Sequence, residues 1–226
     1  MKIGDLSRKG KNRFKQITQA LDKDQQWKST LIPMGILETI TGQGTIVFGN
    51  SRETSDFIVD SLEIWYESRR SKMDDYDTIQ IELDCGPHNN SRRTQFMKRI
   101  AQWSLKIKKK IHLLYFPPYH SKYNPIERFW AALEQYWNGT ILNSIEKTIA
   151  TAQNMKWKGI KPRVFYHDQK YQNGIKLSLK EMAALEKHLF RNQNVGKWNV
   201  LIKPNKKMST LNFLRCLRIC GYSFKS

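Results

Sequence analysis

The sequence of 226 residues has no apolar run long enough to cross a membrane. A spanning helix needs about 20 predominantly apolar residues, and charged or polar side chains interrupt every apolar stretch of this chain. The first residues, 1–5, include the charged side chains of Lys2 and Asp5 and do not resemble a signal peptide. We therefore expect a cytoplasmic protein without a membrane partner.

Cysteine is scarce: Cys85, Cys216 and Cys220 are the three in the chain. Three cysteines give no disulfide framework and are typical of a reducing compartment. Cys216 and Cys220 lie four residues apart but have no second ligand pair. The histidines considered as further ligands are His88, His112 and His120. None of these residues has the spacing of a zinc site, so we expect none.

Acidic residues are few relative to basic ones. The chain has 39 Lys and Arg against 20 Asp and Glu, which gives a formal net charge of +19. An excess of this size favours a polyanionic partner, with nucleic acid first among the candidates. The basic segment 8–13 predicts an exposed loop that is either plain solvated surface or a contact for phosphate groups.

Hydrophobic periodicity predicts the first elements. Two β-branched, apolar runs, 31–40 and 45–49, are separated by a turn with two glycines and predict a β-hairpin. Ser51, Thr54 and Ser55 then offer caps for a helix that ends near 69–72. Its apolar positions recur at helical spacing, and they are Phe57, Ile58, Leu62, Trp65 and Tyr66.

The next segments alternate between strand and helix. Strand patterns at 79–84 and 111–116 are each followed by a helical pattern, at 92–108 and from Pro125 to Asn138. We expect Asn90 or Ser91 to cap the first of these helices. Strands that alternate with helices indicate an α/β fold with parallel neighbours in a sheet that helices flank.

The remainder is less regular. Helical patterns at 142–156 and 179–190 are joined by a basic connector, 156–170. The tail from Lys203 is basic and then apolar, and does not continue the preceding pattern. We predict three parts, which are a core at 1–140, a helical C-terminal extension at 141–202 and an atypical tail at 203–226.

Asp84 stands where the strand 79–84 ends. Gly86 and Pro87 stop the strand at once, so the carboxylate is expected at the rim of the sheet. In open α/β sheets, ligands bind at the carboxyl ends of strands. The alternative is that Asp84 caps the helix that follows.

Glu127 lies in the first turn of the helix that Pro125 opens. If the strands at 79–84 and 111–116 are neighbours, Asp84 and Glu127 face one cleft. Carboxylates are the ligands of hard divalent cations, and a pair of such ions activates in-line phosphoryl transfer. The alternative is that Glu127 only stabilises the start of its helix through the helix dipole.

Two motifs decide between these alternatives. Residues 83–89 read LDCGPHN, and residues 114–130 read LYFPPYHSKYNPIERFW. Both closely resemble the catalytic core of DDE transposases of bacterial insertion sequences. The resemblance is strongest to the Rhodopirellula transposase family, within a wider group that includes mariner-like elements. It covers residues 1–202, including the segment 51–60.

The resemblance implies an RNase H-like fold with three metal-binding acids, of which Asp84 matches the second and Glu127 the third. The first acid ends a strand just upstream of the segment that matches residues 2–8, so this strand and its Asp are expected to be missing. Three other acids are poor substitutes: Asp5 lies in a polar loop, Glu38 lies in the middle of a hairpin strand, and Glu82 is too close to Asp84 in the sequence to replace a ligand from another strand, although it could assist. Losing that strand should leave a gap between the hairpin and the Asp84 strand, with unpaired edges.

The resemblance also implies a function. It is divalent-metal-dependent DNA cleavage and strand transfer for transposition in the bacterial nucleoid, with Mg²⁺ or Mn²⁺ as cofactor, DNA as partner and a possible homodimer. Without the first Asp, we expect a truncated transposase fragment with little or no activity. The alternatives are a non-catalytic basic DNA-binding remnant and another nuclease with an RNase H-like core.

Six side chains near the two acids are candidate DNA contacts: His88, Arg92, Arg93, Lys122, Asn124 and Arg128. His88 would position a phosphate or a water. For the basic residues the alternative is a solvated surface, and for Asn124 it is the helix N-cap. Trp130 and Trp137 are expected in the hydrophobic core rather than stacked on bases.

Overall fold

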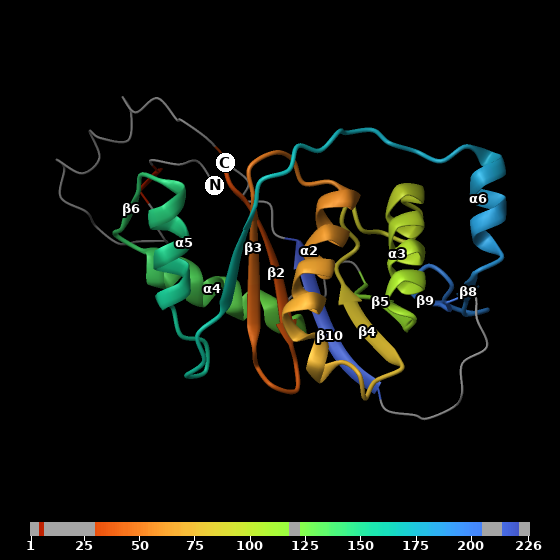
Figure 1. Ribbon diagram of the computed structural model, residues 1–226, viewed down its shortest axis with the longest axis horizontal. Coiled ribbons are helices and arrows are strands. Elements are labelled where there is room, and N and C mark those ends of the chain that lie inside the picture. The colour runs from red at the N-terminus through yellow and green to blue at the C-terminus, as the bar shows by residue number, and fades with distance from the viewer. Residues whose placement is uncertain (1–4, 7–29, 118–122, 205–213, 222–226) are drawn as a thin grey trace.

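The computed structural model describes residues 5–6, 30–117, 123–204 and 214–221. Its centre is an eight-stranded mixed sheet (Figure 1). The strands of this sheet are β2 (Ile32–Glu38), β3 (Gly44–Gly49), β4 (Thr78–Leu83), β5 (Lys110–Tyr115), β7 (Arg163–His167), β8 (Leu189–Arg191), β9 (Asn199–Ile202) and β10 (Leu214–Gly221). The helices are α2 (Ser55–Arg69), α3 (Thr94–Ile107), α4 (Pro125–Trp137), α5 (Ile145–Asn154) and α6 (Leu179–Glu186), and a 3-10 turn, η1 (Arg70–Lys72), follows α2.

The order of strands across the sheet is β7-β3-β2-β10-β4-β5-β9-β8. β2 and β3 form the expected antiparallel hairpin, and β4 and β5 are parallel neighbours, as the alternation of strands and helices predicted. The mixed α/β fold class is therefore confirmed. Two further short strands, β1 (Asp5–Leu6) and β6 (Ile141–Leu142), pair separately in an antiparallel ladder.

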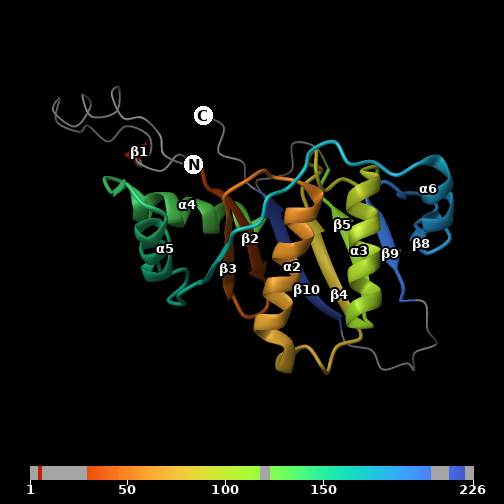
Figure 2. The same cartoon turned by 45° about the horizontal axis from the view of Figure 1, so that its top comes forward.

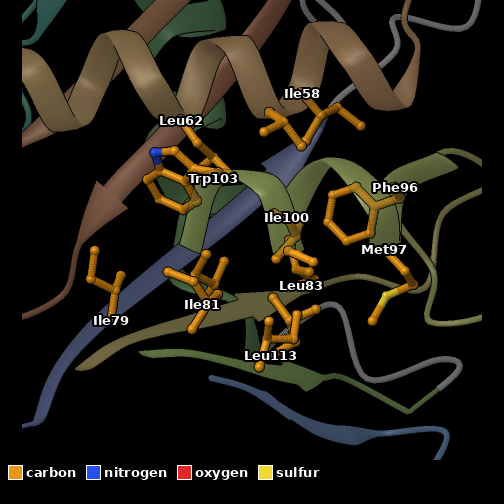
Figure 3. Close-up of a cluster of buried hydrophobic side chains, with 14 of the residues drawn as sticks. Ile58, Leu62, Ile79, Ile81, Leu83, Phe96, Met97, Ile100, Trp103 and Leu113 are labelled. Carbon is orange, nitrogen blue, oxygen red and sulfur yellow. The ribbon is translucent and has the colours of Figure 1, made fainter. Parts of the chain in front are cut away.

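Helices cover both faces of the sheet. α2 and α3 pack side by side on one face (Figures 1 and 2), and α4 packs against β2 and β10 on the other. The core under α2 and α3 joins Ile58 and Leu62 to Ile81 and Leu83 of β4 (Figure 3). The second core lies under α4, and its largest buried side chains include Phe48, Phe129, Trp130 and Trp137. The prediction that both tryptophans are core residues is confirmed.

The expected gap in the sheet is absent. The position between β2 and β4, called here the central strand position, is occupied by β10 from the C-terminal tail. β10 runs antiparallel to β2 and parallel to β4, and both views show it between them (Figures 1 and 2). The prediction of unpaired inner edges was wrong because a segment distant in sequence pairs with both of them.

The C-terminal third contains strands as well as helices. α5 and α6 confirm the two helical patterns, whereas β7 lies inside the basic connector 156–170 and extends the sheet beside β3. β8 and β9 continue the same sheet beyond β5. Charged or polar residues flank the apolar positions of β7, which is why periodicity alone did not indicate a strand. The boundaries at 140 and 202 stay predictions.

The start of α3 also differs from the expectation. Its N-cap is Arg93, which makes no side-chain capping bond. Ser91 Oγ instead donates to the carbonyl of Lys197 at 2.8 Å, and Asn90 Nδ2 donates to the carbonyl of Gly86 at 2.8 Å. These polar groups organise the loop before the helix rather than its first turn.

Among the described residues, no helix is long and apolar enough to span a membrane.

Gly35 in β2 allows α4 to approach the sheet closely. A Cβ atom at this position would lie 2.4 Å from Cζ2 of Trp130. We expect Gly35→Ala to lower the free energy of unfolding by about 1–3 kcal/mol, since the ring is buried and has little room to move. Urea denaturation measures this. In a double-mutant cycle with Trp130→Phe, the combined cost should be smaller than the sum of the two single costs; additive costs would contradict the proposed contact.

Candidate functional site

The loop after β4 holds the first candidate acid. β4 ends at Leu83, and Asp84 opens a turn, 84–90, that is called here the strand-end loop. Asn89, which is 3% exposed, donates from Nδ2 to Oδ1 of Asp84 at 2.7 Å. Tyr115 at the end of β5 in turn donates its hydroxyl to the backbone carbonyl of Asn89 at 2.9 Å. The position of the Asp84 carboxylate is therefore fixed by the neighbouring strand.

The strand-end loop is also tied to α2. Ser55 Oγ at the start of that helix donates to the carbonyl of His88 at 2.7 Å. α3 starts ten residues after Asp84, with Arg93 as its N-cap. The alternative that Asp84 caps the following helix is therefore wrong, because the carboxylate lies at the sheet edge and not at the helix terminus.

α4 carries the second candidate acid. Asn124 is 1% exposed and caps this helix, since its Oδ1 accepts from the backbone N–H of Ile126 at 3.4 Å. Ile126 and Phe129 are buried against the sheet, which leaves Glu127 half-buried between them in the first turn. The prediction of Asn124 as N-cap is confirmed. The helix start and the sheet edge together hold Glu127 in place.

Electrostatics connect the two acids. Burial raises the pKa of the Glu127 carboxyl above its ordinary value, and the negative charge of Asp84 raises it further, with a smaller effect from Glu134. A neighbouring like charge disfavours the ionised form of a carboxyl in this way. Asp84 follows β4 in the register of Gln80 and Glu82, on the face of the sheet opposite Ile81 and Leu83 and therefore on the side of α4.

A third carboxylate adds to the site, and the sequence had not singled it out. Glu53 lies between β3 and α2, and its pKa is raised by burial and then by the charge of Asp84. Its only signal in the sequence was its place within the segment 51–60. Thr54 beside it caps α2, with Oγ1 accepting from the N–H of Phe57 at 3.2 Å. The charge of Asp84 thus acts on two other carboxylates, those of Glu53 and Glu127.

The other acids weighed as substitutes have different surroundings. Glu38 is 3% exposed and forms an ion pair with Arg69 at 2.6 Å, and it also accepts from Nε1 of Trp65 at 3.3 Å. These contacts place Glu38 on the α2 face of the sheet, opposite α4. Glu82 accepts from Nε2 of Gln80 at 3.2 Å. Asp5 pairs through its backbone with Leu142 in the small sheet.

The chemistry of these donors fits a hard divalent cation. Carboxylate oxygens are suitable ligands for Mg²⁺, and a dication would relieve the repulsion by Asp84, which after burial is the second cause of the raised pKa values of Glu53 and Glu127. Within the described residues, however, no group of three or more His, Cys, Asp or Glu side chains is already arranged to hold a metal ion. The donor types therefore fit a divalent metal ion, but fewer than three of these described side chains are grouped closely enough to hold one.

The candidate DNA contacts divide into those near the site and those used elsewhere. Arg92 is exposed, and its positive charge partly offsets the rise in the pKa of Cys85 that burial and Asp84 cause. Cys85 follows Asp84 in the sequence. Arg93 acts on His88, whose pKa is lowered by burial and then by this charge. Arg128 is exposed in the first turn of α4, and Lys122 lies outside the described residues.

Most basic residues along α3 serve its packing. Arg99 pairs with Asp56 at 3.2 Å and also with Asp60, both on α2. Lys106 pairs with Glu63 of α2, and Lys98 lies 3.9 Å from Glu181 of α6. Arg92 and Arg93, just before α3, therefore stay the candidate DNA contacts at this helix, whereas the basic side chains within it are used in these ion pairs.

Comparison with models of protein families matches residues 1–204 to the Rhodopirellula transposase DDE domain. No curated protein sequence and no solved structure matches the chain. Enzymes with this domain typically use divalent metal ions and act on DNA.

Proposed function

The chain belongs to the family of Rhodopirellula transposase DDE domains, and on this basis we propose that it is the catalytic domain of a transposase. Asp84 and Glu127 are its metal-binding carboxylates, Mg²⁺ or Mn²⁺ is its cofactor, and DNA is its substrate. The proposed fold is RNase H-like: a mixed sheet that contains an antiparallel hairpin and parallel inner strands, with helices on both faces.

One observation carries this proposal. Asp84, after β4, raises the pKa of Glu127, which lies on the helix after β5. This effect supports the proposal that the two acids of the family motif, which come from separate elements, act on one site. A bound divalent ion would polarise a phosphate and activate the attacking oxygen. The chain's own part is to hold the two carboxylates, with Asn89 and Asn124 fixing the backbone and side chains around them.

Basic side chains at the rim complete the proposed site. Arg92 and Arg128 are exposed beside Asp84 and Glu127, respectively, and would bind the DNA backbone. Arg93, His88 and Lys122 are further candidates from the sequence. The net charge of +19 supplies the long-range attraction. A homodimer that holds two DNA ends remains part of the proposal.

We also propose that this chain has little strand-transfer activity. The resemblance places three acids in the family motif and matches two of them, Asp84 and Glu127, to residues of this sequence. Glu53 approaches Asp84 from a loop rather than from the strand on which the motif places the first acid. With fewer charged ligands, a divalent ion binds more weakly, and a second ion lacks a fixed position.

The test is an assay of cleavage and joining on DNA that carries the ends of the element, with Mg²⁺ or Mn²⁺. We expect weak metal-dependent nicking that Asp84→Asn and Glu127→Gln each abolish, and almost no joining. Nicking that ignores the end sequence would favour another nuclease. Binding with a steep salt dependence but no effect of metal would favour the non-catalytic remnant.

Replacing Arg92 tests the DNA contact separately. Arg92→Ala should weaken binding to DNA of any sequence and reduce the slope of log K against log salt by about 1, because one phosphate contact is lost. Fluorescence anisotropy at several salt concentrations measures both. The matched control is Arg70→Ala, an exposed arginine at the opposite end of α2. Equal effects of the two substitutions would mean that net charge, not position, governs binding.

A further inference from the structure

The strand at the central strand position is β10, which lies near the C-terminal end of the sequence. Its residues 217–221 pair with Glu38 to Met34 of β2, and its residues 214–218 pair with Thr78 to Glu82 of β4. Without β10, both of these strands would have an unpaired inner edge. The two halves of the sheet would then be joined only through helices and loops.

The two ladders of β10 agree on which of its positions share a face. Leu217 is level with Ile81 of β4, and Ile219 is level with Ile36 of β2. Ile36 and Ile81 are fully buried in the core under α2 and α3. The apolar positions of the strand therefore fall in the register of the hydrophobic face, as a half-buried strand requires. This accounts for the apolar residues of a tail that the sequence left unexplained.

The opposite face of β10 is the face of the carboxylate site. Arg218 and Glu82 are the last pair of the parallel ladder, and the same register continued by two residues brings position 220 level with Asp84. The same position is paired with Gly35 of β2, where Trp130 of α4 packs. Position 220 thus lies on the α4 side, one strand away from Asp84, in neighbouring strands about 4.8 Å apart.

We propose that segment 214–221 is the native central strand of this sheet, and that position 220 is consequently the third corner of the carboxylate site. The occupant of the central strand position is the chain's own segment 214–221. The second part of the inference rests on the proposed function. The residue at position 220 is a cysteine, which lacks the hard oxygen donor that Asp84 and Glu127 have. This explains why the site has carboxylates of the right type but, within the described part of the chain, no third oxygen ligand.

The strand placement is tested by hydrogen exchange on the full chain. The amides of 214–221 should exchange at rates within about tenfold of those of β4, since both are inner strands. Exchange of 214–221 within seconds, while β4 stays protected, would overturn the placement. Protection that appears only in a dimer fraction would mean that a second copy supplies the strand, which overturns the proposed occupant.

A pair of proline variants tests the same point. Leu217→Pro removes a ladder N–H in the middle of β10 and should expose both β2 and β4 to exchange, or unfold the protein. Lys176→Pro, at an exposed position in the loop before α6, should leave exchange in the sheet unchanged. If Leu217→Pro leaves the protection of β2 and β4 intact, the sheet does not depend on this strand.

Position 220 is tested by adding the missing donor. Cys220→Asp should tighten Mn²⁺ binding by about tenfold, measured by calorimetry, because it adds a charged ligand. Cys216→Asp is the matched control, since it is on the same face of β10 but level with Gln80, and should have no effect. Unchanged affinity in Cys220→Asp would refute the third corner. If Asp84→Asn also leaves Mn²⁺ binding unchanged, it is the proposed function that fails, and hydrogen exchange still decides the strand placement.

Discussion

Asp84→Asn is expected to weaken Mn²⁺ binding about 100-fold and to remove the thermal stabilisation that the metal gives. Among the three acids of the candidate site, Asp84 is the one whose charge acts on both others, Glu53 and Glu127. A ligand at 100 times its dissociation constant stabilises the folded state by about 2.7 kcal/mol. At the same Mn²⁺ concentration, the variant should show less than about a third of this, and thermal denaturation with and without Mn²⁺ measures the difference.

The matched control is Asp75→Asn. Asp75 is exposed just before β4, at the end of the strand away from Asp84, so the same chemical change is made without touching the site. The control should bind Mn²⁺ as the unchanged protein does. Equal losses in both variants would mean that Mn²⁺ responds to overall charge, and the assigned site would be wrong.

Without metal, the same substitution has the opposite effect on stability. The raised pKa values of Glu53 and Glu127 mean that the folded state binds protons more tightly than the unfolded chain. Their contribution to stability is therefore present below the ordinary carboxyl pKa and is lost as the pH rises through the raised values. Asp84→Asn reduces this shift, so the metal-free variant should lose less stability between about pH 4 and 7. Denaturation at several pH values measures this.

Arg69→Met is expected to have the largest effect on folding. Arg69 pairs with Glu38 at 2.6 Å, and their side chains are 5% and 4% exposed. Removal of the arginine leaves the carboxylate of Glu38 buried without its counter-charge, which costs about 3–5 kcal/mol. Nε1 of Trp65 and Oγ1 of Thr41 also donate to this carboxylate, so the disturbance extends across β2 and α2.

Arg70→Met is the control for this prediction. Arg70 follows Arg69 in the sequence, but its side chain is 67% exposed in its pair with Glu67, and an exposed pair is worth at most about 1 kcal/mol. Chemical denaturation measures the free energy of unfolding of both variants, and the difference between them reports the cost of breaking the buried pair. A double variant, Glu38→Met with Arg69→Met, should recover part of the loss. If the two single arginine variants are equally stable, the buried pair does not support the fold.

The sequence by itself determined the local elements and the two acids. Apolar periodicity gave the hairpin, α2, α3 and α4, because a strand or a helix must turn one row of apolar side chains toward a core. Asp84 and Glu127 were identifiable because strand ends and helix starts are marked by short-range signals such as Gly86, Pro87 and Pro125. The family resemblance gave these two acids a common role.

Only the tertiary structure decided the partners of each element. The central strand comes from residues 214–221, and β7 comes from a basic connector, since strand pairing depends on hydrogen bonds between segments distant in the sequence. For the same reason, Glu53 was not anticipated near Asp84. Its sequence position indicates only a loop before α2. Its electrostatic interaction with Asp84 arises because the ends of β3 and β4 lie at the same edge of the sheet.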